Sequence, residues 1–279
     1  MNDPILSFRN VSFGYHPSRP ILWDVNFDLH PGRITAVLGP NGSGKTTLLS
    51  LAMGWLAPWT GEIRLGGIPL KTISSRERGR RMALVPQTEH TPFDYTVLEY
   101  VLMGRAPHLP PLEMPTSTDT EIALNALEQV GIASLAERPV PQLSGGERQL
   151  MLLARSLAQI QTPSSTAKTA RRNGSSHSAL STSYLILLDE PTAHLDLRNK
   201  ARLIQIMRHL RDLGVTLLMT NHEPEVVLAV ADDVILMESG VAPQFGAMDQ
   251  VFTAEALSRI YQIPIRLVQA DGHQHVLWT

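Results

Sequence analysis

The sequence lacks cysteine over its entire length of 279 residues. Disulfide bonds, thiolate metal sites and cysteine nucleophiles are therefore excluded, and the absence is compatible with a cytosolic protein. Long hydrophobic runs are also missing, because the longest unbroken apolar stretch, Val226 to Ala231, is far too short to span a bilayer. The N-terminal residues Met1 to Pro4 lack the basic and apolar segments of a signal peptide, so we expect none there.

An excess of charge of either sign is absent as well. The formal net charge is −2 and charged residues make up 18% of the chain, so nothing global indicates a nucleic-acid partner, and we expect none. A hydrophobic content of 43% is ordinary for a globular protein. The length suits one large α/β domain with a smaller appended part.

The segment Gly39 to Thr46 fits the pattern G-x-x-x-x-G-K-[ST] in full. It follows the apolar run Ile34 to Leu38 and precedes a helix-like segment, which is the order in which this pattern binds polyphosphate. Glycines let successive N–H groups point into one concavity, and the helix start adds free amide donors. Lys45 would reach the β- and γ-phosphates, and the Thr46 hydroxyl would bind Mg²⁺. The candidate ATP-binding residues here are Gly39, Pro40, Asn41, Gly42, Ser43, Gly44, Lys45, Thr46 and Thr47.

Three further apolar runs each lead to polar residues at their carboxyl ends. They are Met82 to Val85 before Gln87, Tyr184 to Leu188 before Asp189 and Glu190, and Val215 to Met219 before His222. Strands that are apolar throughout predict a parallel sheet covered by helices, and ligands bind outside the carboxyl ends of such strands. These polar residues are therefore expected to gather with the Gly39 loop on one edge.

The N-terminal part is expected to be β-structure over residues 5–38. Alternating apolar residues, as in Leu6 and Phe8, predict antiparallel strands with one buried face, and Gly61 to Gly67 predicts a further strand and hairpin. Tyr15 lies at a strand end ahead of the phosphate loop, where an aromatic ring can stack on adenine. Packing is the alternative role for this tyrosine.

The sequence also predicts how the chain is divided into a core, a helical subdomain and an insertion. Residues 1–87 and 184–279 are expected to form a RecA-like core that includes the antiparallel part, and residues 88–160 a helical subdomain with helices over 96–103 and 119–130. A strand is expected over 233–237. Residues 161–183 contain eleven Ser or Thr, which predicts a disordered surface loop and favours a tolerated insertion over a regulatory segment.

The pair Asp189-Glu190 completes the pattern of a phosphate-loop ATPase. Asp189 is a candidate Mg²⁺ ligand through water, and Glu190 is a candidate base for the attacking water. Gln87 is a third candidate to ligate Mg²⁺, or it could bind the water, and His222 could support the γ-phosphate or the water. A solvated loop and a structural histidine are the alternatives, which the glycine loop disfavours.

The stretch Leu143 to Gln149 combines a capping box with two glycines. Ser144 and Glu147 stand three residues apart before a helical apolar stripe, which predicts a capped helix. Gly145 and Gly146 within the cap would let a phosphate approach this helix start closely. The sequence thus carries two phosphate-binding helix starts.

With these motifs the sequence resembles the ATP-binding-cassette ATPases over nearly its whole length. The motifs in common are Tyr15, Gly39 to Thr46, Gln87, Leu143 to Gln149, Asp189-Glu190, Leu195-Asp196 and His222. The resemblance implies a head-to-tail pair of subunits that encloses two ATP molecules. Each ATP would lie between the Gly39 loop of one chain and the Ser144, Gly145, Gly146 and Glu147 stretch of the other, with Asp196 helping to align the opposing site.

Within that family the sequence is most similar to the ATPases of bacterial importers for ferric siderophores, haem and cobalamin. Similar stretches include Gly104 to His108, Pro191 to Arg198 and Gln250 to Val268. The resemblance implies separate permease subunits, contacted through residues 88–140, an indirect solute-binding partner, and a peripheral position at the cytoplasmic face of the inner membrane. The loop at 161–183 and Asn221-His222-Glu223 depart from the family, since many cassettes have Thr or Ser before the histidine and Asp after it.

Three other functions agree less well with the sequence. A cassette ATPase acting on DNA or ribosomes would usually carry a heptad insertion, a zinc cluster, a basic face or a second cassette, none of which is present in the sequence. A small-molecule kinase would have no use for the Ser144 signature. A non-hydrolysing partner or scaffold is disfavoured by Glu190 and His222.

Overall fold

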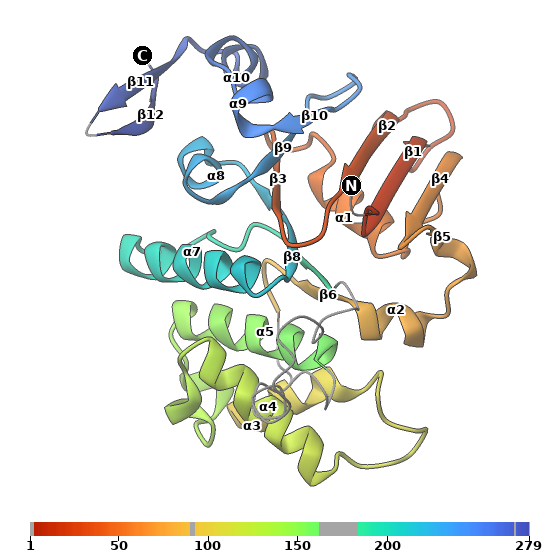
Figure 1. Cartoon of the computed structure of the whole chain (residues 1–279), viewed down its shortest axis with the longest axis vertical. Coiled ribbons are helices and arrows are strands. Elements are labelled where there is room, and N and C mark those ends of the chain that lie inside the picture. Colours follow the sequence, from red (N-terminus) through yellow and green to blue (C-terminus); the bar gives the residue numbers. More distant parts are fainter. Residues whose placement is uncertain (1–2, 90–92, 162–183, 271, 279) are drawn as a thin grey trace, which may run out of the picture.

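The computed structural model describes residues 3–89, 93–161, 184–270 and 272–278 (Figure 1). A six-stranded sheet lies at its centre, with the strand order β10-β9-β3-β8-β7-β6. The strands are β3 (Ile34–Leu38), β6 (Met82–Val85), β7 (Leu185–Leu188), β8 (Thr216–Asn221), β9 (Asp233–Leu236) and β10 (Gln244–Ala247). All neighbours pair in parallel except β10 with β9. The predicted α/β class with a parallel sheet is confirmed.

A second sheet is antiparallel and comes from the N-terminal part. Its strands are β1 (Leu6–Phe13), β2 (Leu22–Leu29), β4 (Thr60–Leu65) and β5 (Ile68–Pro69), in the order β2-β1-β4-β5. Phe8 pairs with Phe27 in the register of β1 and β2, and their rings stack with centroids 4.5 Å apart. The predicted antiparallel pairing of this part is confirmed, as is the hairpin at Gly66-Gly67.

The two faces of the parallel sheet are buried in different cores. Successive residues of β3 alternate between them, since Ala36 packs with the helices and Val37 packs with the antiparallel sheet and α1 (Lys45–Ala52). The helices on the first face include α5 (Gly145–Ile160), α7 (Leu197–Asp212), α8 (Pro224–Val230), α9 (Met248–Val251) and α10 (Ala254–Tyr261). Burial on both faces explains why these strands are apolar throughout.

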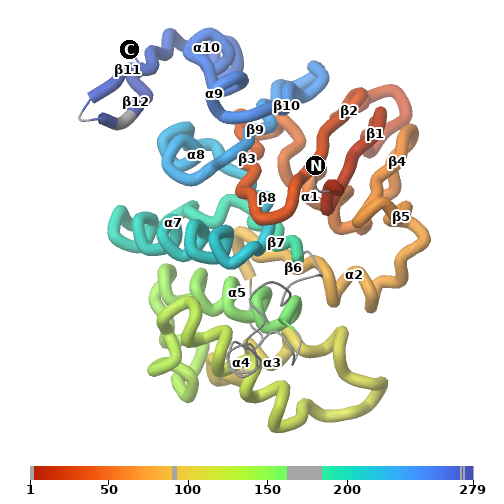
Figure 2. The backbone as a smooth tube through the Cα atoms, viewed as in Figure 1, coloured from red at the N-terminus to blue at the C-terminus, as the bar shows by residue number. Residues whose placement is uncertain are grey.

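Helices α3 (Val97–Leu102), α4 (Ser117–Gln129) and α5 lie together at one end of the molecule (Figure 2). Each begins with a complete capping box, formed by Thr96 with Glu99, Thr116 with Asp119 and Ser144 with Glu147. The cap at Thr116 starts α4 earlier than the apolar pattern predicts, because a cap lies outside the buried stripe. Short 3₁₀ turns η2 (Met103–Arg105), η3 (Ala133–Leu135) and η4 (Val140–Gln142) connect these helices.

Several elements were not predicted. Helix α2 (Ser75–Arg81) has no buried residue, so no apolar stripe could reveal it, and the 3₁₀ turn η1 (Leu70–Thr72) precedes it. The C-terminal segment contains a hairpin of β11 (Ile265–Ala270) and β12 (His273–Trp278), which was not expected from the sequence. The expected disordered loop at 161–183 lies outside the described residues, apart from Gln161.

Candidate nucleotide site

The phosphate loop connects the end of β3 to the start of α1. Gly42 and Gly44 have φ angles of 82° and 99°, a left-handed conformation that costs glycine little. At Gly39 a side chain would collide with the carbonyl oxygen of Met237, so the loop passes close to β9. The free N–H groups of the first turn of α1 face the same space as the loop amides.

Lys45 is a buried cation at this helix start. Its Nζ donates to the carbonyl oxygens of Gly39 and Pro40 at 2.9 and 3.2 Å, and lies 3.4 Å from Glu190 Oε1. These contacts fix the ammonium at the mouth of the loop, where it faces the carboxylate that the sequence marked as a base.

Asp189 is held between two threonine hydroxyls. Thr46 Oγ1 donates to Asp189 Oδ2 at 3.1 Å, and Thr220 Oγ1 donates to Asp189 Oδ1 at 2.6 Å. Thr220 also accepts the Glu190 backbone N–H at 2.9 Å. The hydroxyl and carboxylate oxygens of Thr46 and Asp189 are hard donors of the kind that Mg²⁺ prefers, so these residues fit that ion.

Glu190 meets two of the other predicted residues. Its Oε2 accepts from Gln87 Nε2 at 3.4 Å and lies 3.1 Å from His222 Nδ1. The φ of Glu190 is 44°, an uncommon value for a residue with a side chain, and the Thr220 contact to its N–H helps to hold it. The structure therefore brings together the ends of β6, β7 and β8 as their parallel register requires.

Two adjoining cavities lie at this edge. One of about 530 Å³ is lined by Ile21, Asn41, Gly42, Gly44, Lys45, Thr46, Thr47, Gln87 and Glu190. The other, of about 440 Å³, is lined by Tyr15, His16, Arg19, Pro20, Ile21, Gly42, Ser239 and Gly240. Tyr15 is 61% exposed, with its ring set edge-on against Phe13 at 5.2 Å. The phosphate-loop residues thus line the first cavity, and Tyr15, which the sequence marks as the candidate to stack on adenine, lines the second.

The signature stretch lies elsewhere on the chain, since neither cavity is lined by Ser144 or by its glycines. Ser144 Oγ accepts the Glu147 N–H, and the hydrogen bonds from the Ser144 backbone and hydroxyl lower the pKa of Glu147. A side chain on Gly145 would meet no atom within 4 Å, so this helix start has open space before it. Within one chain the structure does not bring the signature to the phosphate loop.

Asp196 is next to the signature through Asn199. It caps α7 by accepting the Asn199 N–H at 2.8 Å. The Asn199 side chain packs against Gly146 so closely that a Cβ there would lie 2.5 Å from Asn199 Cγ. Asp196 and the signature therefore share one surface of the chain.

Two contacts at the site, those of Thr220 and Tyr261, were not predicted from the sequence. Thr220 follows Met219, which pairs with Leu188 in the parallel register, so aligning β8 with β7 would have placed it beside Asp189. Tyr261 donates to the His222 carbonyl oxygen at 2.9 Å, and no local pattern in the sequence indicates this contact.

Comparison with known proteins gives the family. The family model described as ABC transporter matches residues 22–162. The hemin import ATP-binding protein of Pseudomonas putida is 36% identical over 93% of this chain and 94% of its own, and the molybdate import ATP-binding protein of Haemophilus influenzae is 35% identical over 95% and 91%. The chain belongs to the ATP-binding-cassette transporter family. As a member of it, the protein binds and hydrolyses ATP, which confirms the resemblance seen in the motifs.

A solved structure agrees with this assignment. A metal-chelate type ABC transporter in an inward-facing conformation contains a chain that is 32% identical, with a TM-score of 0.80 over 100% of this chain and 98% of that one. Among the described residues, none of the helices is both long and apolar enough to pass through a bilayer.

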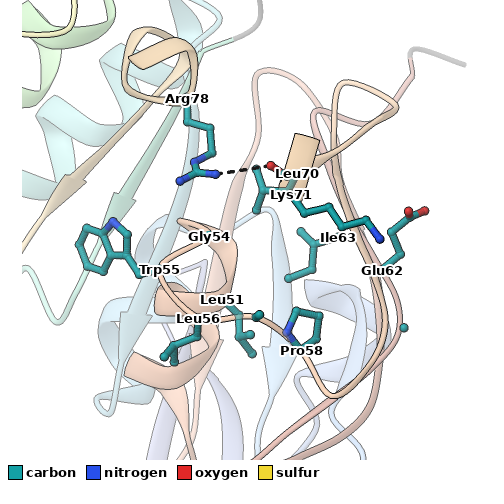
Figure 3. A pocket seen from close by; sticks show the side chains of 12 residues that line it. Leu51, Gly54, Trp55, Leu56, Pro58, Glu62, Ile63, Leu70, Lys71 and Arg78 are labelled. Carbon is teal, nitrogen blue, oxygen red and sulfur yellow. Dashed lines mark hydrogen bonds between the residues drawn. The ribbon is translucent and has the colours of Figure 1, made fainter. Parts of the chain in front are cut away.

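A further cavity of about 300 Å³ lies away from the ATP-binding edge, beyond the end of α1. It is formed between Trp55 and Pro58 on one side and Leu70 and Arg78 on the other (Figure 3). Arg78 also donates to the Ile73 carbonyl oxygen at 3.1 Å, which ties α2 to this wall. None of the phosphate-loop residues lines it.

Proposed function

We propose that the chain is the ATP-hydrolysing subunit of an importer for a metal chelate, of the class of ferric siderophores, haem and cobalamin. The observation that carries the proposal is similarity over nearly the full chain to a hemin importer subunit and to a metal-chelate type transporter. Similarity of this extent includes the C-terminal segment as well as the ATP-binding edge.

The contacts of the site residues and the cavities that they line support the following proposed roles. Lys45 binds the β- and γ-phosphates, and Tyr15 stacks on the base. Thr46, Asp189 and Gln87 would hold Mg²⁺, which would neutralise charge on the phosphate oxygens when bound. Glu190 takes the proton of the attacking water, and His222, 3.1 Å from that carboxylate, orients it.

A head-to-tail pair of chains would complete each site. The helix start at Ser144 to Gly146 has open space before it and offers free N–H groups, yet is remote from the phosphate loop of its own chain. We infer that it binds the γ-phosphate held by a partner chain, with Asp196 beside the same interface. Two-fold symmetry then encloses two ATP molecules.

We also propose a role for each segment of the chain. Residues 1–87 and 184–279 form the ATP-binding core, and residues 88–160 form the helical subdomain. Residues 88–140 contact the permease at the cytoplasmic face of the inner membrane, where the protein is peripheral. A solute-binding protein acts indirectly, through that permease.

Transport assays test the proposal. The chain is coexpressed with the membrane protein that copurifies with it, and the complex is reconstituted in vesicles with ATP on the side of this chain. Labelled haem, ferric siderophore and cobalamin are then supplied, with molybdate as the oxyanion alternative. ATP-dependent uptake of a chelate that is lost in Glu190→Gln supports the proposal. Uptake of molybdate alone, or of none of these solutes, contradicts it.

A further inference from the structure

The tripeptide Asn221-His222-Glu223 lies at the carboxyl end of β8. In the structure each flanking residue makes a specific contact. Asn221 is 1% exposed, its Nδ2 donates to Thr192 Oγ1 at 2.9 Å, and its Oδ1 accepts the Glu223 N–H at 2.8 Å. Thr192 follows Glu190 by two residues, so Asn221 ties the histidine loop to the loop that carries the proposed base.

Glu223 ties the same loop to α7. Both its carboxylate oxygens accept from Lys200 Nζ, at 2.5 and 2.8 Å, and the two side chains are only 30% and 21% exposed. Lys200 lies in the first turn of α7, where its N–H bonds the Asp196 carbonyl oxygen at 2.9 Å. Because the pair is partly shielded from water, its attraction is stronger than that of a surface pair.

Tyr261 provides the third contact, from α10 in the C-terminal segment. Its hydroxyl donates to the carbonyl oxygen of His222 itself, at 2.9 Å. Burial, and then the nearby Glu225 carboxylate, raise the pKa of Tyr261 well above its ordinary value, so the hydroxyl keeps its proton and remains a donor. This contact joins the histidine loop to the C-terminal segment.

The His222 ring needs such support because packing does not fix it. Its side chain is 45% exposed, and its hydrogen bond is the one to Glu190. An exposed ring on an untethered backbone would sample several orientations. We propose that Asn221, Glu223 and Tyr261 are positioning residues that hold the backbone of His222 so that its ring faces Glu190. The inference rests on the proposed role of His222 in hydrolysis.

The first test uses Tyr261→Phe, which removes one hydroxyl and keeps the ring packed. We expect kcat for ATP hydrolysis to fall about fivefold, the value of one hydrogen bond, with KM for ATP nearly unchanged. The ring nitrogen resonances of His222, identified by their loss in His222→Gln, should shift in ¹⁵N-histidine spectra. Tyr184→Phe, which removes a hydroxyl at the amino end of β7, is the control and should leave both readouts unchanged.

The second test exchanges the ion pair. Lys200→Glu alone places two carboxylates together, and we expect it to lower kcat and to shift the His222 resonances. Adding Glu223→Lys restores an opposite-charge pair in reversed order, so much of the lost kcat should return. A merely structural role would change the melting temperature without this rescue of kcat.

The results separate the two proposals. If the wild-type protein hydrolyses ATP but Tyr261→Phe and Lys200→Glu match it in kcat and in His222 resonances, the positioning role is overturned while the ATPase assignment stands. If the wild-type protein has no ATPase activity, the proposed role of His222 fails. The spectra still report then whether Tyr261 and Glu223 orient the ring.

Discussion

Glu190 receives contacts from four sides: the Lys45 ammonium, the Gln87 amide, the His222 ring and, on its N–H, the Thr220 hydroxyl. In the proposed function this carboxylate takes a proton from water beside the γ-phosphate. We expect Glu190→Gln to bind ATP with nearly wild-type affinity and to hydrolyse it at least about 100-fold more slowly.

Calorimetric titration measures the affinity of the Glu190→Gln protein for ATP, and a phosphate-release assay measures its rate of hydrolysis. Glu62→Gln, on the exposed side of β4, serves as the control and should hydrolyse ATP normally. A Glu190→Gln protein that keeps most of its turnover would remove Glu190 from the role of base.

Thr220 joins the two acidic residues through one hydroxyl, which donates to Asp189 and accepts from Glu190. Thr220→Val keeps the shape but leaves the partly buried Glu190 N–H without its partner, so we expect a loss of about 1 kcal/mol in the free energy of unfolding and a lower kcat. Thr216→Val on the same strand removes the acceptor of the Gly32 N–H, and should reduce stability without lowering kcat. Urea unfolding and steady-state kinetics distinguish the two variants, and equal kcat in both would refute the role given to Thr220.

At the scale of elements, the helical part depends on a buried ion pair. Arg105 is 2% exposed and bonds Asp119 at 2.9 Å and the carbonyl oxygens of Ala158 and Gln161 at the end of α5. One guanidinium thus joins the first turn of α4 to the last turn of α5. The carbonyl oxygens at a helix end need such partners because they have none within the helix.

The pKa of Asp119 predicts how this element responds to acid. Burial alone would raise that pKa, but hydrogen bonds from the Thr116 N–H and from the Arg105 and Thr116 side chains outweigh it and lower the pKa. The stabilisation is therefore complete above the unfolded value of about 3.9 and is lost as the pH falls through the lower folded pKa.

Arg105→Met should reduce the free energy of unfolding by about 3–5 kcal/mol at neutral pH, because it leaves Asp119 buried without its cation. The acid part of the stability profile should become flatter than in the wild type, since the folded pKa rises toward the unfolded one. Arg64→Met breaks only the exposed pair with Glu62 and should cost at most about 1 kcal/mol. Urea unfolding between pH 3 and 7 measures the free energy of unfolding of both variants. An equal decrease in that free energy in the two variants would contradict the proposed role of Arg105.

At the scale of the whole molecule, the two helix starts that we propose to bind phosphate line different surfaces, so the proposed closed site needs a partner chain. In a Glu190→Gln background, we expect ATP to induce a dimer that Ser144→Arg abolishes, while ATP affinity of the monomer stays nearly unchanged. Ser74→Arg removes a comparable cap at α2 and should still dimerise. Sedimentation velocity with and without ATP measures dimer formation. A stable ATP-dependent dimer of the Ser144→Arg protein would refute the head-to-tail arrangement of the two chains.

The sequence by itself determined the elements whose signals are local. The glycine loop, the apolar runs of β3, β7 and β8, and the capping box at Ser144 each depend on residues within a few positions of one another, so their backbone geometry follows from nearby side chains. The parallel register then implied that Asp189, Glu190 and His222 meet at one edge. Helix α2 and the β11–β12 hairpin have too little apolar burial to leave such a signal.

Only the tertiary structure decided which distant groups meet. Thr220 reaches Asp189 across 31 positions, and Tyr261 reaches His222 across 39, from a helix whose place on the sheet no local pattern specifies. The pairing of Lys200 with Glu223 likewise depends on how α7 packs beside β8. Contacts of this kind form because packing of the shared core brings their elements together, and the core depends on the whole chain rather than on any one segment.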